Sequence, residues 1–285
     1  MIHLLHDDTL TQENREKFLR TVQKYSQEIE FVNIEKYKSQ LTDELRKFAE
    51  RWTIGTLFRL FIPEVLDLDK VIYLDSDILV NLDIKNFWDI DFEEKSLVGI
   101  REIPGSSFID KLNAMRKKLI DCDDDTYINS GVLMMNLRKI RERGSLFELV
   151  VDWMLKNREL LLAPDQDALN SLFHGDIKFA DRKFNVFNTD EFFQECMIHA
   201  LLTKPWAHLT GKQSDRIYWK MYTRNAWGED SDRDELIDKF SDIIFAARHS
   251  NERRSKRILE ALERRLKWLF IIAKYSLKAK AKSRA

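Results

Sequence analysis

The feature that most constrains the fold is a short apolar run that ends abruptly in two aspartates. Residues 70–74 read Lys-Val-Ile-Tyr-Leu, and Asp75 and Asp77 follow with only Ser76 between them. A short run of this kind predicts a buried strand. Ligands of an open parallel sheet bind beyond the carboxyl ends of its strands. Such a carboxylate pair suits Mg²⁺ or Mn²⁺, with a diphosphate completing the shell; an acidic strand end that only faces solvent is the alternative.

Other apolar runs alternate with helical patterns along the chain. Strands are expected near residues 3–6, 29–34, 97–100 and 130–136, and helices over 12–25 and up to about Phe61, with Pro63 marking the end of the second helix. This alternation predicts an α/β fold built around a largely parallel sheet. We expect one domain over residues 1–228 and a C-terminal extension, helical in pattern and basic, over residues 229–285.

Two further motifs place polar side chains beside predicted elements. Asn129 stands before Ser-Gly and an apolar strand, where its amide either faces a ligand or forms a turn. Asp165 and Gln166 follow Pro164 at the start of a helical pattern. They are either ordinary helix-opening residues or groups that hydrogen-bond sugar hydroxyls, since the glutamine amide supplies both a donor and an acceptor.

A histidine and a lysine form the last motif. His199 lies in an apolar run, and Lys204 precedes Pro-Trp. A neutral imidazole can complete a metal site begun by aspartates, and a lysine can neutralise a phosphate. A histidine satisfied within the core is the alternative.

Taken together and in order, these motifs resemble glycosyltransferase family 8, which includes bacterial galactosyl- and glucosyltransferases and glycogenin. The residues that carry the resemblance are Arg59, residues 73–80 (Tyr-Leu-Asp-Ser-Asp-Ile-Leu-Val), residues 129–132 (Asn-Ser-Gly-Val), residues 165–167 with Asn170, and His199 before residues 204–206. The match covers roughly residues 1–228, and five ordered motifs are far more specific than any one of them.

The resemblance implies a GT-A catalytic domain that transfers galactose or glucose from a UDP-sugar with retention. The implied acceptor is a glycan that is free, lipid-linked or protein-linked. Asp75, Asp77 and His199 would hold Mn²⁺ or Mg²⁺. The implied donor-binding residues are Arg59, Asp75, Ser76, Asn129, Asp165, Gln166 and Lys204. Catalysis would fall to Asp165 and Gln166, with Gln166 stabilising charge, since an amide is a poor nucleophile beside a carboxylate.

The chain departs from the family pattern at three places. It opens at what resembles the second strand of the domain, so we expect either a truncated N-terminus or a protein that manages without the usual first strand. The segment between His199 and Lys204 is one residue short and has Leu202 near the place of a glycine. Glu102 stands where an aspartate is expected, so the sugar specificity is expected to differ. A non-catalytic or truncated binding subunit is therefore the alternative function. A metal-dependent nucleotidyltransferase or phosphohydrolase would need a glycine-rich loop that the N-terminal region lacks.

The net charge of −1 conceals a strongly basic C-terminal segment. Between residues 253 and 284 only Glu260 and Glu263 oppose the lysines and arginines. Leucines at helical spacing between them predict an amphipathic cationic helix that contacts an anionic membrane surface, or one that packs on the domain with a solvated basic face. No nucleic-acid partner is expected, because no recognised binding motif accompanies this charge.

Cysteine usage and hydropathy indicate the compartment. Cys122 and Cys196 have neither metal-ligand spacing nor a disulfide framework, which favours a reducing environment. The N-terminal residues do not read as a signal peptide, and no apolar run approaches membrane-spanning length. We therefore expect a cytoplasmic protein, with peripheral binding to the inner face of the membrane through the basic helix.

Overall fold

The structure is a computed structural model that describes residues 1–43, 45–46, 54–187, 195–201, 204–207, 213–230 and 238. The basic segment 253–284 and most of the expected extension 229–285 lie outside the described residues, so both remain predictions. The chain divides into two compact units. The first comprises Met1–Asp67, Ser76–Leu82 and Val186–Ala247, and the second includes Leu68–Asp75 and Asp83–Asn185.

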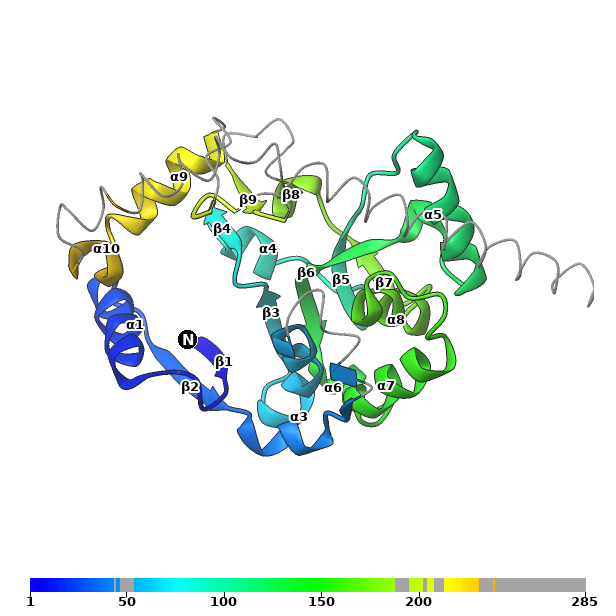
Figure 1. The fold of residues 1–285 in the computed structure, drawn as a ribbon, viewed down its shortest axis with the longest axis horizontal. Coiled ribbons are helices and arrows are strands. Elements are labelled where there is room, and N and C mark those ends of the chain that lie inside the picture. Colours follow the sequence, from blue (N-terminus) through cyan, green and yellow to red (C-terminus); the bar gives the residue numbers. More distant parts are fainter. Residues whose placement is uncertain are drawn as a thin grey trace, which may run out of the picture. The chain divides into compact units, whose positions relative to one another are not determined.

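The first unit begins with a β-α-β segment. Strands β1 (Ile2–His6) and β2 (Ile29–Asn33) pair in parallel and are joined by helix α1 (Gln12–Lys24). The Thr11 side chain caps α1 by accepting a hydrogen bond from the Asn14 N–H, which satisfies one of the free amides of the first turn. The strands and helix predicted here are confirmed (Figure 1).

Short helical segments follow β2. They are η1 (Glu35–Gln40), η2 (Ile54–Phe61) and α3 (Ile62–Val65). The predicted end of a helical stretch near Phe61 is confirmed by η2, but Pro63 does not follow the last helix, because it lies in the first turn of α3. A proline fits there, since the first-turn N–H groups have no partner within the helix.

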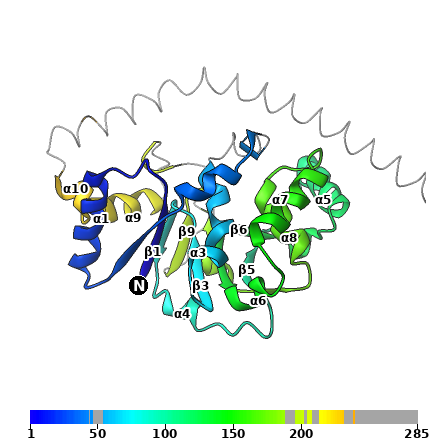
Figure 2. The same cartoon turned by 90° about the horizontal axis from the view of Figure 1, so that it is seen from below.

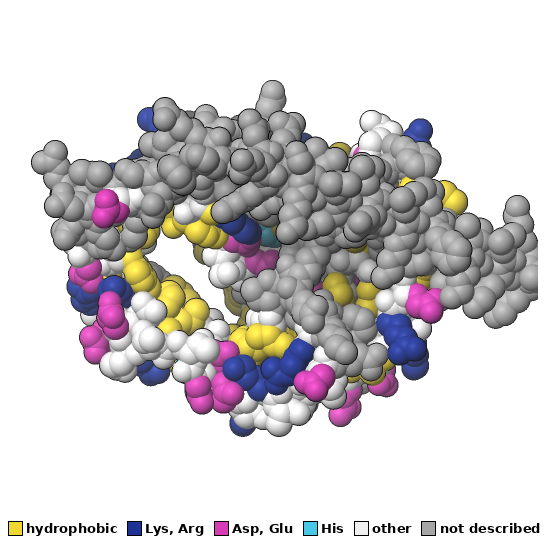
Figure 3. Space-filling view, in the orientation of Figure 1, with side chains coloured by type: hydrophobic (Ala, Val, Ile, Leu, Met, Phe, Trp, Pro, Cys, Tyr) yellow, Lys and Arg dark blue, Asp and Glu magenta, His cyan; other side chains and the backbone are white. Residues whose placement is uncertain are grey.

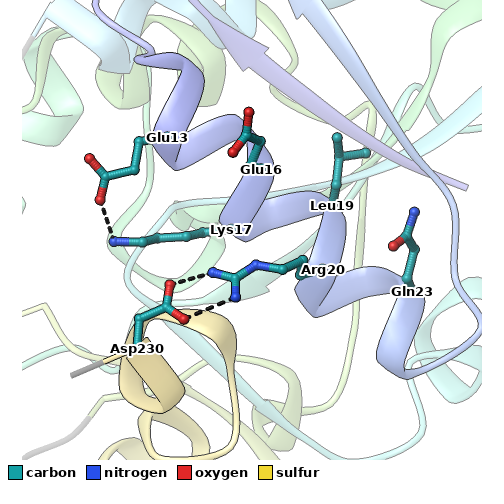
Figure 4. Close-up of a pocket in the computed structure, with 7 residues that line it drawn as sticks. All are labelled: Glu13, Glu16, Lys17, Leu19, Arg20, Gln23 and Asp230. Carbon is teal, nitrogen blue, oxygen red and sulfur yellow. Dashed lines mark hydrogen bonds and ion pairs between the residues drawn. The ribbon is translucent and has the colours of Figure 1, made fainter. Parts of the chain in front are cut away.

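A three-stranded sheet completes the core of the first unit. Strand β4 (Ile78–Asn81) runs antiparallel to β9 (Cys196–His199), which pairs in parallel with β8 (Val186–Phe187). Apolar side chains of this sheet pack against Ile217, Tyr218 and Met221 of α9 (Gln213–Tyr222). Helix α10 (Ala226–Asp230) packs on α1, where Asp230 forms an ion pair with Arg20 in the lining of a pocket (Figure 4).

The second unit contains a four-stranded sheet in the order β3-β6-β5-β7. Its strands are β3 (Lys70–Leu74), β5 (Leu97–Arg101), β6 (Ile128–Asn136) and β7 (Ile177–Phe179). Its helices are α4 (Lys85–Trp88), α5 (Phe108–Leu119), η3 (Asp124–Thr126), α6 (Leu137–Arg141), α7 (Leu146–Lys156), α8 (Pro164–Leu172) and η4 (Arg182–Phe184). Helices α7 and α8 pack against each other, and α8 contacts β6 (Figures 1 and 2).

The α/β class is confirmed, but the sheets are mixed rather than mostly parallel. Strand β6 runs antiparallel to both β3 and β5, whereas β5 and β7 are parallel. A long buried strand such as β6 reads as an uninterrupted apolar run whichever way its neighbours point. Its direction is therefore set by the chain's connections and not by its own sequence.

Strand β6 also contains an irregularity beside β5. Gly99 of β5 lies opposite Leu133, but the next residue, Ile100, lies opposite Asn129, so residues 130–132 bulge away from β5. The same stretch stays paired with β3, where Leu74 lies opposite Val132. The turn predicted after Asn129 is therefore wrong, because Asn129 pairs with Ile100 and the residues after it form a bulge inside the strand. Bulges of this kind re-aim side chains next to functional sites.

Candidate functional site

The turn between β3 and β4 positions the two motif aspartates. The Asp75 N–H donates to the Gly131 carbonyl at 2.8 Å, which extends the β3–β6 pairing by one residue. The Tyr73 hydroxyl donates to Asp75 Oδ1 at 2.6 Å. On the other side of exposed Ser76, the Asp77 carbonyl accepts from the Ala200 N–H at 3.0 Å. Both ends of the turn are thus fixed by strand hydrogen bonds.

The Asp77 carboxylate lies between two basic side chains. His199 Nε2, on a side chain that is 1% exposed, lies 3.2 Å from Asp77 Oδ1, and Lys204 forms an ion pair with Oδ2. Burial alone would raise the pKa of Asp77, but hydrogen bonds and charge from His199 and Lys204 lower it to about 2. The carboxylate is therefore ionised at neutral pH, as a metal ligand must be. Figure 3 shows acidic, basic and histidine side chains gathered at one place on the drawn face.

Asp75, Asp77 and His199 form a group suited to a cation. Each offers one ligand atom, and these atoms all lie within 4.8 Å of one another. Two carboxylates and an imidazole are donors that Mn²⁺ accepts, and the carboxylates also suit Mg²⁺. The predicted metal ligands are thus brought together, and their chemistry fits a divalent ion. His199 is buried, as a core histidine would be, and its contact with Asp77 also makes it available as a ligand.

Within the second unit, the side-chain amide of Gln166 is held at both ends. Its Oε1 accepts from Asn129 Nδ2 at 3.1 Å, from the Ser130 N–H at 3.0 Å and from Ser130 Oγ at 3.4 Å. Its Nε2 donates to Glu102 Oε1 at 3.0 Å. The β6 bulge supplies the Asn129 and Ser130 donors, while α8 supplies Gln166. Predicted residues Asn129 and Gln166 therefore meet directly.

Asn129 is itself held in place by two donors. Its Oδ1 accepts from the Gly131 N–H at 3.0 Å and from Asn185 Nδ2 at 2.9 Å. These bonds leave Nδ2 as the group that faces Gln166, so the network assigns the orientation of both amides.

The first turn of α8 carries two buried aspartates. Asp165 and Gln166 are buried at the helix start, with Pro164 in the first turn. Asp167 is fully buried and accepts from Arg116 Nη1 at 2.8 Å and from the Tyr127 hydroxyl at 2.6 Å. Its Oδ2 also accepts from the N–H groups of Leu162 and Ala163. Asp167 therefore anchors the helix start to α5 and to Tyr127, the residue before β6.

Asn170 fixes α8 to β6 at a second point. Its Oδ1 accepts from the Ile128 N–H at 2.7 Å, and its Nδ2 donates to the Ile128 carbonyl at 2.9 Å. The side chain thus replaces a strand neighbour for one residue of β6. In the Asp-Gln-Asp-x-x-Asn motif, Asp167 and Asn170 therefore hold the helix in place.

The remaining predicted residues belong to the first unit. Arg59 is buried on η2, and its Nε donates to the Thr56 carbonyl at 3.0 Å. Lys204 is partly buried and contacts Asp77, as described above. Arg59 therefore lies in the same unit as Asp77, His199 and Lys204, whereas Asn129, Asp165 and Gln166 lie in the other.

Several polar residues around Gln166 were not predicted from the sequence. They are Arg116 and Lys117 of α5, Tyr127, and Asp124 of η3, while Glu102 was identified only as a departure from the family pattern. One signal was available: Arg116 shares a helix face with Leu112 and Leu119, at spacings of four and three residues. A base on an apolar face requires a buried acid as its partner.

Comparison with known proteins identifies the family. Residues 1–210 match the model of glycosyl transferase family 8. A putative glycosyltransferase of Haemophilus influenzae is 30% identical over 65% of this chain and 54% of its own length. A lipopolysaccharide 1,2-glucosyltransferase of Escherichia coli is 27% identical over 62% of this chain and 56% of its own length. The chain thus spans about half the length of these curated relatives.

Solved structures show the same fold. The galactosyltransferase LgtC in complex with donor and acceptor sugar analogues superposes with a TM-score of 0.65 at 22% identity, covering 84% of this chain and 99% of that chain. The glycosyltransferase GlyE of Streptococcus pneumoniae gives a TM-score of 0.52 at 19% identity over 77% of this chain and 60% of that chain. The predicted GT-A fold is confirmed. Among the described residues, none of the helices is both long and apolar enough to span a membrane.

Proposed function

The chain belongs to glycosyltransferase family 8, and on that premise we propose that it transfers a hexose from a UDP-sugar with retention of configuration. The hexose is galactose or glucose, and the acceptor is a saccharide, a lipid-linked glycan or a glycoprotein. The relatives named as a glucosyltransferase and a galactosyltransferase support this choice of donor sugars.

The observation that carries the proposal is the environment of Asp77. The pKa of Asp77 is lowered to about 2, so its carboxylate is ionised and can bind a cation. His199 Nε2 lies 3.2 Å from this carboxylate, and Asp75 is two residues away. Together these three side chains are suitable ligands for Mn²⁺ or Mg²⁺. A divalent ion bound there would supply Lewis-acid stabilisation of the UDP leaving group. Asp75, Asp77 and His199 would hold that ion, and Ser76 would contact the nucleotide.

Lys204 has two partners in the proposed mechanism. Without a donor its ammonium group neutralises Asp77. With a metal and donor bound, Lys204 would lie near the diphosphate, where its positive charge would stabilise the negative charge on UDP. The ion pair therefore keeps the ammonium group close to its position of use.

Arg59, Asn129, Asp165 and Gln166 bind the donor sugar in this proposal. The Gln166 carbonyl oxygen already accepts from Asn129 and Ser130, which withdraws electron density from it. This favours attack by the acceptor on the face that UDP leaves, with Gln166 and Asp165 stabilising positive charge on the sugar, over attack by the amide oxygen itself.

We also propose a cytoplasmic location, with the basic segment 253–284 in peripheral contact with an anionic membrane. Lipid-linked acceptors would then be presented at the same surface.

The test is turnover of defined donors. UDP-galactose and UDP-glucose are each incubated with the protein and Mn²⁺, UDP release is followed, and the anomer of the transferred sugar is read by NMR with lactose and glucose as acceptors. The proposal predicts UDP release from at least one donor, loss of release in Asp77→Asn, and full release in Asp89→Asn, an aspartate that pairs with Lys85 on the surface. Equal release from Asp77→Asn, or an inverted anomer, would refute it.

A further inference from the structure

Glu102, which stands where the family pattern has an aspartate, lies next to Gln166 in the structure. Glu102 follows β5, and its N–H donates to the Tyr127 carbonyl at 2.9 Å, which ties it to the start of β6. Its Oε1 accepts from Gln166 Nε2 at 3.0 Å. This is the hydrogen bond that holds the NH₂ end of the Gln166 amide, opposite the end held by Asn129 and Ser130.

The second oxygen of Glu102 faces Lys117. Lys117 Nζ lies 3.4 Å from Glu102 Oε2 and 2.8 Å from Asp124 Oδ1, and the Lys117 side chain is only 3% exposed. The ammonium group also lies 3.8 Å from the centre of the Tyr127 ring. One buried cation therefore serves two partly exposed carboxylates, of which only Glu102 reaches Gln166.

We propose that Glu102 is a positioning residue that sets the orientation of the Gln166 amide, with Lys117 fixing the Glu102 carboxylate. This inference rests on the proposed function, because it assigns a role in the transfer that Gln166 assists. The amide has donors on its oxygen and a charged acceptor on its nitrogen, so a rotation by half a turn would place NH₂ against Asn129 Nδ2 and the carbonyl against a carboxylate. Glu102 thus makes that rotation costly and keeps the amide in one state.

The variant that tests this is Glu102→Gln, which preserves shape. A glutamine has one carbonyl oxygen, and Lys117 as a donor attracts that oxygen, which turns the new NH₂ group toward the NH₂ group of Gln166. The matched control is Asp124→Asn. It removes a carboxylate that also pairs with Lys117 and has nearly the same exposure, 22% against 25% for Glu102, but that does not hydrogen-bond to Gln166.

Two readouts separate positioning from general support of the fold. In protein labelled with ¹⁵N-glutamine, the Gln166 side-chain NH₂ signal, assigned by its loss in Gln166→Leu, shifts in Glu102→Gln and stays in place in Asp124→Asn. In steady-state turnover of the UDP-sugar, we expect Glu102→Gln to lower kcat about tenfold or more, as loss of a hydrogen bond to a charged group predicts. The KM for the donor should change less than about threefold. Asp124→Asn should have kcat and KM near those of wild type.

A second variant covers the case in which Glu102→Gln fails to fold. Glu102→Asp keeps the charge near Lys117 but withdraws the carboxylate from Gln166, and it is expected to lower kcat in the same way. An unshifted Gln166 signal, or equal losses of kcat in Glu102→Gln and Asp124→Asn, would overturn the inference. If the wild-type protein turns over no UDP-sugar, the proposed function fails, and the ¹⁵N signal alone decides the orientation of the amide.

Discussion

Arg116 Nη1 donates to Asp167 Oδ2 at 2.8 Å, and both side chains are fully buried, at 1% and 0% exposed. The pair joins α5 to the first turn of α8, two residues from Asp165. Removing one partner of a buried pair leaves a charge in a medium of low dielectric, which costs much more than an exposed pair contributes. The second aspartate of the Asp-Gln-Asp motif therefore belongs to the framework of the site.

We expect Asp167→Asn to lower the free energy of unfolding by roughly 3–5 kcal/mol, because the Arg116 guanidinium loses this carboxylate. Asp165→Asn, the same change two residues earlier, is expected to cost less stability and to lower turnover of the UDP-sugar. Urea unfolding followed by circular dichroism, together with the turnover assay, checks both variants. Equal losses of stability in the two variants would contradict this division of roles.

The Asp7 carboxylate gives a prediction for acid stability. Burial alone would raise its pKa, but the Lys38 ion pair at 2.7 Å and hydrogen bonds from Thr9 lower it to about 2 from an ordinary 3.8. Ionised Asp7 therefore stabilises the folded state above about pH 4, and this stabilisation is lost as the pH falls through about 2 and Asp7 is protonated.

We expect Lys38→Met to reduce the free energy of unfolding by about 0.5–1 kcal/mol at neutral pH, the range of a partly exposed pair. The difference in unfolding free energy between the variant and wild type should decrease as the pH falls from 4 to 2, because protonated Asp7 no longer forms an ion pair with Lys38. Urea unfolding of both proteins at pH 7 and pH 3 measures this difference. A difference that is larger at pH 3 than at pH 7 would contradict the predicted direction of the pH dependence.

The contact between α1 and α10 contains both an exposed ion pair and a less exposed aromatic contact. The Arg20–Asp230 pair is 52% and 36% exposed (Figure 4), whereas the partly buried Trp227 ring lies edge-on to Phe18 with 4.7 Å between centroids. We expect Asp230→Ala to have little effect on stability, because solvent screens this exposed pair, and Trp227→Ala to cost about 2–4 kcal/mol. Thermal unfolding in low and high salt checks this, and a larger loss in Asp230→Ala would refute it.

The ion pair between Lys204 and Asp77 predicts opposite effects on metal and nucleotide. Lys204→Met removes a cation that competes for Asp77, so binding of Mn²⁺ alone should tighten severalfold. The same change removes a charge from the diphosphate, so binding of UDP in the presence of Mn²⁺ should weaken about tenfold. Calorimetric titrations of Mn²⁺ and of UDP provide the two constants, and a parallel loss of both would contradict the competition.

Local patterns in the sequence predicted most of the elements that carry the site. The strand before Asp75, the β-α-β start and the helix opened by Pro164 were each visible in runs of a few residues. The bulge in β6 was not, because Asn-Ser-Gly is also a turn sequence. Only its pairing with both β3 and β5, brought together from distant parts of the chain, keeps it in a strand.

Site residues that belong to family motifs could be predicted from the sequence. Residues that only support those motif residues through tertiary contacts could not. Asp75, Asp77 and His199 were identified from motif order and meet in the structure. Lys117 was not, because a lysine in a helix rich in bases reads as a solvated residue. Its burial against Glu102, Asp124 and Tyr127 depends on tertiary packing alone.

The most direct test of the central claim is calorimetric titration of UDP into the protein, with and without Mn²⁺, in wild type, Asp77→Asn and the surface control Asp89→Asn. We expect binding of UDP that requires Mn²⁺ in wild type and in Asp89→Asn and that is lost in Asp77→Asn. No binding of UDP by wild type in either condition, or binding that Asp77→Asn retains, would contradict the assignment of Asp77 to a metal-dependent UDP-sugar site.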